Sequence, residues 1–272
     1  MKNISVKKSF IWVMLAIGGI VMMTPIIFMF SASFKYNDQI YDLALLSSEP
    51  TLSNYFYLFE NTEFLTWFMN SFFVAMIVTI SVLFFDALIG YTLCKFKFKG
   101  RKLIFIAILS TLMIPTEMLV IPWYILSKDL GLLDTFFGLI FPGLMSGFGV
   151  FLMKQFFEGV PDDYLDAARV DGLNEFQIFI EIALPMVTPA LSALAIFTFL
   201  GNWTAFLWPL IVTSSAELYT IPVGLSSFSG EFQSEWEMIM TGAAVASLPT
   251  LLVYLLLQRY IIRGVILGGL KG

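Results

Sequence analysis

Histidine is absent from this chain of 272 residues, and cysteine occurs once, as Cys94. Without histidine the chain lacks the most common zinc ligand and the usual proton carrier at neutral pH. A single thiol cannot form an intramolecular disulfide. The P-loop pattern G-x-x-x-x-G-K-[ST] is also missing, so the chain has no such route for hydrolysing ATP itself. With no Ser/His or Cys/His set, we expect no catalytic site, no metal site and no enzyme activity.

Charged residues are also scarce, at 13% of the chain, whereas 58% is hydrophobic and 17% aromatic. A helix needs about 20 apolar residues to cross the hydrocarbon core of a membrane. Such runs occur six times, at about 10–32, 67–94, 103–126, 136–156, 187–213 and 239–262. The pattern predicts an all-α, polytopic membrane protein with six transmembrane helices, which form a single transmembrane domain over residues 1–272.

The few basic residues are distributed very unevenly between the two sides of these spans. One side would carry only Lys35 and Lys128. The other would carry Lys2, Lys7, Lys8, Lys95, Lys97, Lys99, Arg101, Lys102, Lys154, Arg169, Arg259, Arg263 and Lys271. Because Lys and Arg accumulate in cytoplasmic loops, thirteen against two predicts that both termini lie in the cytoplasm.

The second cytoplasmic loop, at about 157–186, is a polar interruption that contains the stretch DAARVDGLNEFQIFIEIALP at 166–185. Pro161 suits the first position of a helix, and Gly172 suits a left-handed stop. Asn174 and Gln177 then have the spacing of a capping box. We expect two short helices around a turn, which fits either a docking element or a solvated connector. The loop is acidic, so it is not an anchor for anionic lipid, which requires clustered Lys and Arg.

The spacing in this loop resembles the EAA loop of ABC importer permeases, which inserts into a cleft of a separate ATPase subunit. The matching residues are Asp166-Ala167-Ala168, then Gly172 after three residues, then Ile182-x-Leu184-Pro185 after nine more. Further matches are MIPTE at 113–117, GLLDT at 131–135, FLWPL at 206–210, YTIPVGL at 219–225 and GLKG at 269–272. Together they are similar to the shorter permease of carbohydrate-uptake ABC importers, the maltose-type family.

Two positions depart from the family pattern. Asp166 stands where the family usually has Glu, which keeps the charge and removes one methylene. The fifth span reads Trp203-Thr204-Ala205 and lacks the Asn and Asp of the family's W-N-D-F-L-W-P. We expect the first change to preserve docking, whereas the second weakens any transfer of sugar contacts to this segment.

The resemblance implies the fold of type I importer permeases and a position in a bacterial inner membrane. It implies a second permease as heterodimer partner, two ATPase subunits that bind ATP and Mg, and an external sugar-binding protein. The chain would contact lipid, bind no cofactor of its own and bind no nucleic acid. The implied ATPase-coupling residues are Asp166, Ala167, Ala168, Arg169, Asp171, Gly172, Ile182, Leu184 and Pro185. The implied contacts of the C-terminus with the ATPases are Lys271 and Gly272.

Asp86 and Glu117 are carboxylates within the predicted spans, where such groups are costly and mark transport pathways by default. With Asn202, Trp203 and Trp208 they provide the residue types that bind sugars, and we take these five as candidates for the substrate path. Two other interpretations stay open. Asp86 fits an interhelical hydrogen bond, and Trp side chains often lie at the membrane interface.

An ion-coupled secondary carrier that uses Asp86 and Glu117 as a relay is the alternative to an ATP-driven importer. A carrier of this kind would need no docking loop. Within the importer interpretation, no Lys or Arg lies well inside the predicted spans. This absence favours a neutral sugar, and we expect an oligosaccharide, over a phosphorylated substrate.

Overall fold

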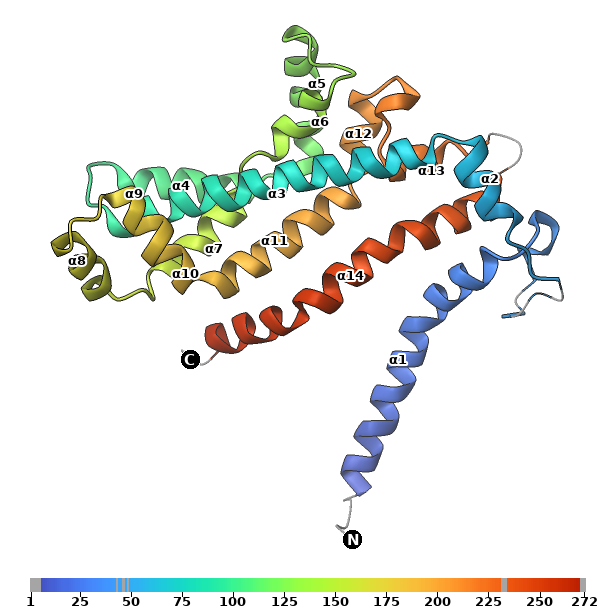
Figure 1. Ribbon diagram of the computed structural model, residues 1–272, viewed down its shortest axis with the longest axis horizontal. Helices are drawn as coiled ribbons and strands as arrows, with labels where there is room; N and C mark the ends of the chain where they lie inside the picture. The colour runs from blue at the N-terminus through green and yellow to red at the C-terminus, as the bar shows by residue number, and fades with distance from the viewer. Residues whose placement is uncertain (1–5, 43, 46, 48, 231–233, 270–272) are drawn as a thin grey trace. The chain divides into compact units, whose positions relative to one another are not determined.

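The computed structural model describes residues 6–42, 44–45, 47, 49–230 and 234–269, and the side chains from residue 8 to residue 255 within these ranges. In this part of the chain the regular structure is helical, and extended pairing is limited to the isolated bridge between Ser229 and Ser234. The α-helices, labelled in Figure 1, are α1 Val6–Ala32, α2 Ser53–Asn61, α3 Phe64–Lys95, α4 Arg101–Thr111, α5 Val120–Asp129, α6 Phe136–Ile140, α7 Gly147–Phe157, α8 Asp162–Val170, α9 Glu175–Gln177, α10 Leu184–Met186, α11 Thr188–Trp203, α12 Leu207–Val212, α13 Ile221–Ser226 and α14 Trp236–Gly269.

The chain divides into two compact units. The first contains residues 1–65 and 224–248, and the second contains residues 66–223 and 249–272. The single transmembrane domain expected over residues 1–272 stays a prediction.

The first unit is held together by polar contacts at the end of α1. Asn54 on α2 donates to the carbonyl groups of Ser33 and Lys35, at 3.1 and 2.8 Å. Thr241 on α14 donates to the same Ser33 carbonyl. The Lys35 ammonium is itself buried and donates to the backbone carbonyl groups of Asp42 and Ala44. These bonds satisfy carbonyl groups of the segment that follows α1, where the chain is not part of a regular helix.

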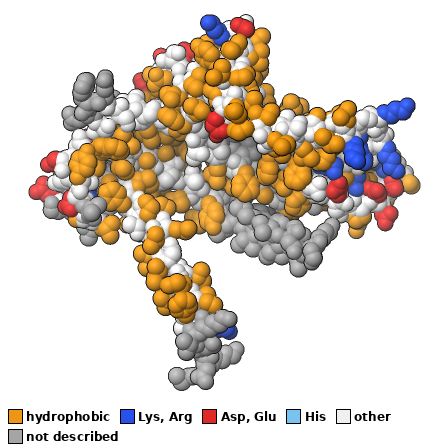
Figure 2. Space-filling view, turned by 180° about the vertical axis from the view of Figure 1, so that it is seen from behind, with side chains coloured by type: hydrophobic (Ala, Val, Ile, Leu, Met, Phe, Trp, Pro, Cys, Tyr) orange, Lys and Arg blue, Asp and Glu red, His pale blue; other side chains and the backbone are white. Residues whose placement is uncertain are grey.

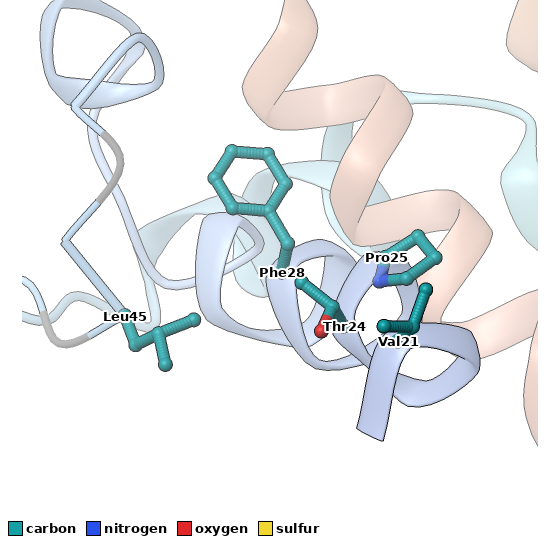
Figure 3. A pocket seen from close by; sticks show the side chains of 5 residues that line it. All are labelled: Val21, Thr24, Pro25, Phe28 and Leu45. Atoms are coloured by element: carbon teal, nitrogen blue, oxygen red, sulfur yellow. The ribbon is translucent and has the colours of Figure 1, made fainter. Parts of the chain in front are cut away.

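Helix α1 carries a long apolar surface that the rest of its unit does not cover. None of its 18-residue apolar window is buried, and hydrophobic side chains occupy its visible face in Figure 2. A hollow beside the helix is lined by Val21, Thr24, Pro25, Phe28 and Leu45 (Figure 3). Apolar surface of this extent in water would be unfavourable, so α1 requires lipid or another protein around it.

The second unit packs α3 and α7 against the loop helices and α11. The buried core includes Val78 and Tyr91 on α3, Phe157 on α7, and Phe179 and Leu194 further along the chain. Figure 1 shows α3 and α11 alongside each other, and aromatic rings of the two helices meet, such as Phe72 with Phe199. At the end of this unit that carries α8 and α9, charged side chains gather (Figure 2).

Three described helices are long and apolar enough to cross a membrane, and the count rises to six if each bent helix pair is one span. The expected spans 10–32, 67–94 and 239–262 correspond to α1, α3 and α14. The expected span 136–156 is the pair Phe136–Gly143 and Gly147–Phe157, bent by 44°.

The span expected at 103–126 is not one straight helix. Helix α4 ends at Thr111, and the chain continues after a 94° bend as a short 3-10 helix and α5. Pro115 accounts for the break. It has no N–H to donate to the carbonyl of Thr111, and its ring disfavours a helical Ile114.

The span expected at 187–213 is also interrupted. Helix α11 ends at Trp203, and α12 begins at Leu207 after residues with non-helical backbone angles. Pro209 cannot donate to the Ala205 carbonyl, so the helix cannot continue through this point without losing a bond. The π-helix Ile178–Ala183 and α10 precede α11, and an 84° bend separates them from it.

Candidate coupling loop and substrate path

The turn of the loop is built by local hydrogen bonds. Gly172 has a φ of +88°, the left-handed conformation that glycine adopts without steric cost. Its N–H donates to the Arg169 carbonyl, and the Leu173 N–H donates to the Ala168 carbonyl. This pair of bonds is a Schellman motif, which ends α8 at the position that the sequence predicts.

The second helix of the loop begins with a capping box. The Asn174 side chain accepts from the N–H groups of Phe176 and Gln177, and the Gln177 side chain accepts from the Asn174 N–H at 3.0 Å. The predicted cap is therefore confirmed. The expectation for Pro161 was wrong by one residue, because its extended backbone makes it the N-cap of α8 rather than the first helical residue.

Arg169 joins the two helices across the turn. Its guanidinium donates twice to Glu175, at 2.7 and 3.2 Å, and once to Asp166. These bonds raise the pKa of Arg169 above its ordinary value and hold the pKa of Glu175 below its own. A bidentate pair of this kind restricts geometry as well as adding energy, so α8 and α9 are held as one body.

A second ion pair connects the loop to α3. The Lys95 ammonium lies 2.7 Å from the Asp162 carboxylate and 2.6 Å from the Val160 carbonyl. The bond from Lys95 and its charge lower the pKa of Asp162. The start of α8 is therefore linked to the end of a membrane-spanning helix.

The structure divides the Asp166-Ala167-Ala168 triplet between two faces. Ala168 is buried, with Leu165, against the core of its own chain, whereas Ala167 is exposed. The outward face also carries Tyr164 and Val170, which are 59% and 88% exposed. Neither residue is among the predicted coupling residues. Tyr164, Ala167 and Val170 are nevertheless spaced three residues apart, which places them on one face of a helix.

Behind α8 lies a cluster of three rings. Tyr91 on α3 is 5.3 Å from Phe157 on α7 and 5.2 Å from Phe179 in the π-helix, measured between ring centroids. Ile182 and Leu184 are half-buried against the same core, whereas Pro185 is exposed. The cluster gives the loop a packed connection to two helices of the second unit. Lys271 and Gly272, the candidates at the C-terminus, lie outside the described residues.

Asp86 is fully buried and lies between α3 and α7. Its carboxylate accepts from the Ser146 N–H at 3.1 and 3.2 Å, and from the Ser146 hydroxyl at 2.8 Å. Ser146 in turn caps α7 by accepting from the Gly149 N–H. Gly149 must be small here, because a Cβ would lie 2.1 Å from an Asp86 oxygen. This is the geometry of an interhelical hydrogen bond.

A hollow of about 420 Å³ opens in the second unit between α4, α7 and α11. Its polar lining comes from hydroxyl and amide side chains, those of Thr111, Thr116, Ser146, Thr198 and Asn202. The rest is apolar apart from glycine, with the indole of Trp123 as the largest ring, and no lining residue carries a charge.

Only one of the five predicted path residues, Asn202, lines this hollow. Trp203 is buried, with its ring against Phe68 and Phe199. Trp208 donates to the Gly138 carbonyl and meets Trp123 edge-on, so it supports the lining from behind. Glu117 is exposed in the 3-10 helix beside the hollow.

Two of the matching motifs outside the loop, YTIPVGL and GLLDT, also have structural roles. Asn70 donates to the carbonyl groups of Glu217 and Tyr219, and the Ser71 hydroxyl accepts from the Ile221 N–H. Asp134, in GLLDT, accepts from Ser214 and Ser215. These contacts tie the segment after α12 to α3 and to the turn after α5.

The chain belongs to the family of binding-protein-dependent transport system inner membrane components, whose model matches residues 87–267. It is therefore a permease component in the inner membrane, as the sequence predicts. The arabinooligosaccharides transport system permease protein of Bacillus subtilis is 38% identical over 253 residues, which cover 91% of this chain and 90% of that protein. The sn-glycerol-3-phosphate transport system permease protein of Pectobacterium atrosepticum is 32% identical over 264 residues, covering 93% and 94%.

The fold matches that of a solved bacterial ABC transporter involved in the import of the acidic polysaccharide alginate. The TM-score is 0.84 over 96% of this chain and 100% of that one, at 24% identity. This match confirms the predicted all-α fold. Family membership also decides between the two functions considered above, in favour of the importer over an ion-coupled carrier.

Proposed function

We propose that this chain forms the translocation path of a neutral oligosaccharide importer together with a second permease. Two ATPase subunits bind at residues 162–185, an external binding protein delivers the sugar, and both termini lie in the cytoplasm. In this proposal ATP and Mg are bound by the ATPase subunits, and this chain catalyses no reaction.

The observation that carries the substrate class is the uncharged lining of the hollow. Its volume is in the range of small-molecule sites. Hydroxyl groups and the Asn202 amide can exchange hydrogen bonds with sugar hydroxyls, and the Trp123 ring offers an apolar surface. A phosphate group would instead require Lys or Arg, which bind it by charge-assisted bonds. The B. subtilis relative is named as an arabinooligosaccharide permease, which agrees with this substrate class.

The observation that supports coupling is the double connection of the loop. Its outward face presents Tyr164, Ala167 and Val170 together with exposed acidic residues such as Asp163, a surface that a protein cleft can cover. Its inward side is joined to α3 by the Lys95–Asp162 pair and by the rings around Tyr91. When the ATPase subunits close, a movement of α8 would reach α3 and α7 through these contacts. The helices joined in this way would be the two-state element whose equilibrium nucleotide binding shifts.

The test is ATPase stimulation of the complete importer, reconstituted in liposomes with its binding protein. The panel contains neutral oligosaccharides, the matching monosaccharides and glycerol 3-phosphate. We expect stimulation by a neutral oligosaccharide and none by glycerol 3-phosphate. Stimulation by glycerol 3-phosphate alone would reject the substrate class, and ATPase activity without any uptake of a stimulating sugar would reject the coupling.

A further inference from the structure

The stretch KFKFKGRK at 95–102, which runs from the last residue of α3 into the first residues of α4, has five basic residues and no acidic one. Lys95 is paired with Asp162 in the coupling loop. The proposed transport function uses none of the other four basic residues. Clustered basic residues beside membrane-spanning helices are the pattern that attracts anionic lipid headgroups.

Two of these residues line a cavity of about 270 Å³, which is bounded by Leu93, Arg101, Lys102, Phe105 and Lys154. Its walls come from α3, α4 and α7. The helices α3 and α7 approach closely at Gly90, where a Cβ would lie 2.8 Å from the Lys154 backbone nitrogen. The close packing brings Lys154 to the two basic residues of α4, although it is more than 50 positions away in the sequence.

The three cations of the cavity are positioned differently. The Arg101 guanidinium donates through one nitrogen to the Cys94 and Phe96 carbonyl groups, at 3.3 and 3.1 Å. Lys154 forms an ion pair with Glu158, and its ammonium lies 4.5 Å from the centre of the Phe105 ring. Lys102 is exposed, and among the described side chains it has neither an ion pair nor a hydrogen bond. The three cations and the one carboxylate, that of Glu158, leave a net positive charge at the cavity, which attracts an anion.

The surface next to the cavity is apolar. Leu93 and Phe105 form part of the lining. Along α4, Leu103 is 71% exposed and Ile106 is 52% exposed. A soluble phosphate would gain nothing from these side chains, whereas the acyl chains of a lipid would cover them. We propose that the cavity binds the phosphate of an anionic phospholipid, with Lys102 and Arg101 at the headgroup and the acyl chains along α4.

The experiment titrates the assembled importer, containing the full chain, with phosphatidylglycerol or phosphatidylcholine of equal chain length. Native mass spectrometry measures bound lipid. We expect one saturable site, which binds phosphatidylglycerol with higher affinity than phosphatidylcholine. Lys102→Gln should weaken it about fivefold, the equivalent of about 1 kcal/mol per basic residue. Lys154→Gln should weaken it as well, because it removes a charge from the opposite wall.

The matched control is Lys99→Gln, which removes the same charge from the same segment at a residue that does not line the cavity. It should change the affinity less than twofold. Equal losses in Lys99→Gln and Lys102→Gln would mean diffuse surface attraction and overturn the proposal. Equal binding of the two lipids would do so too, as would displacement of phosphatidylglycerol by millimolar inorganic phosphate, which would identify a free-phosphate site.

Discussion

Ser146 donates hydrogen bonds from both its backbone N–H and its hydroxyl to the carboxylate of Asp86, a residue 60 positions earlier in the chain. The contact joins the C-terminal half of α3 to the N-cap of α7 and is fully buried at Asp86. A buried carboxylate persists only where donors replace the water that it has lost. We therefore assign Asp86 to the packing of these two helices rather than to the substrate path.

Replacing Asp86 with Ala should lower stability and leave transport intact at low temperature. The Ser146 N–H and hydroxyl would lose their acceptor, which costs about 1–3 kcal/mol. Asp86→Asn should cost less, because its carbonyl oxygen still accepts one bond. The measurement is the thermal unfolding midpoint of the purified complex beside uptake at 15–20 °C. An Asp86→Ala protein with an unchanged midpoint and no uptake would return Asp86 to the transport path.

Replacing Gly172 with Val should uncouple ATP hydrolysis from uptake and leave the protein in the membrane. A β-branched residue at a φ of +88° is strained by about 1–2 kcal/mol, and the turn between α8 and α9 would shift. Gly172→Asn is the matched control, since Asn tolerates the left-handed region. The readout is sugar uptake per ATP hydrolysed in proteoliposomes. Substrate-stimulated uptake at the normal ratio in Gly172→Val would contradict the docking assignment.

Replacing Val170 with Glu should weaken ATPase binding at least tenfold without affecting the fold. Val170 is 88% exposed, so the change costs this chain little by itself. In a complex the new carboxylate would be buried without a partner. Co-purification of the ATPase subunits and the unfolding midpoint of the permease measure the two effects. Val170→Ala is the control and should bind within about threefold of the unaltered protein. Normal ATPase binding by Val170→Glu would place the docking face elsewhere.

Replacing Asn202 with Leu should raise the sugar concentration required for half-maximal uptake by about twofold to tenfold. The change removes the amide from the lining of the hollow, and one hydrogen bond to a neutral group contributes about 0.5–1.5 kcal/mol. Basal ATP hydrolysis should not change. Thr204→Val is the control, since Thr204 is exposed two residues away and does not line the hollow. Equal effects of the two variants on uptake would exclude the hollow as the sugar path.

The contact of Asp134 with Ser214 and Ser215 should make stability depend on acid pH. The backbone N–H of Ser214, followed by the Ser215 bonds, holds the pKa of Asp134 below its usual value of 3.8. The stabilisation is therefore complete above about pH 4–5 and is lost as the pH falls through the lowered folded-state pKa. Unfolding midpoints of the unaltered protein and Asp134→Asn should differ at pH 6 and converge towards pH 3. A difference that stays constant over this range would show that the charge of Asp134 is not involved.

The sequence by itself determined the membrane class, the family and the local form of the coupling loop. The Gly172 turn and the Asn174 cap depend on hydrogen bonds between residues at most five positions apart. Such bonds are specified by the identity and spacing of neighbouring residues, so a pattern can predict them. The long apolar runs at α1, α3 and α14 are equally local, because hydropathy and length decide them.

Tertiary structure alone decided which candidate side chains meet. Trp203 fits a sugar path by type but packs into the core, whereas Trp123 reaches the hollow. Asp86 accepts hydrogen bonds from Ser146, which lies 60 positions later in the chain. Lys154 lines the same cavity as Arg101, which lies 53 positions earlier. These outcomes depend on how helices bend at Pro115 and approach at Gly90, and on which faces are then covered. No local pattern contains that information, because the energy of burying a side chain belongs to all the neighbours that surround it.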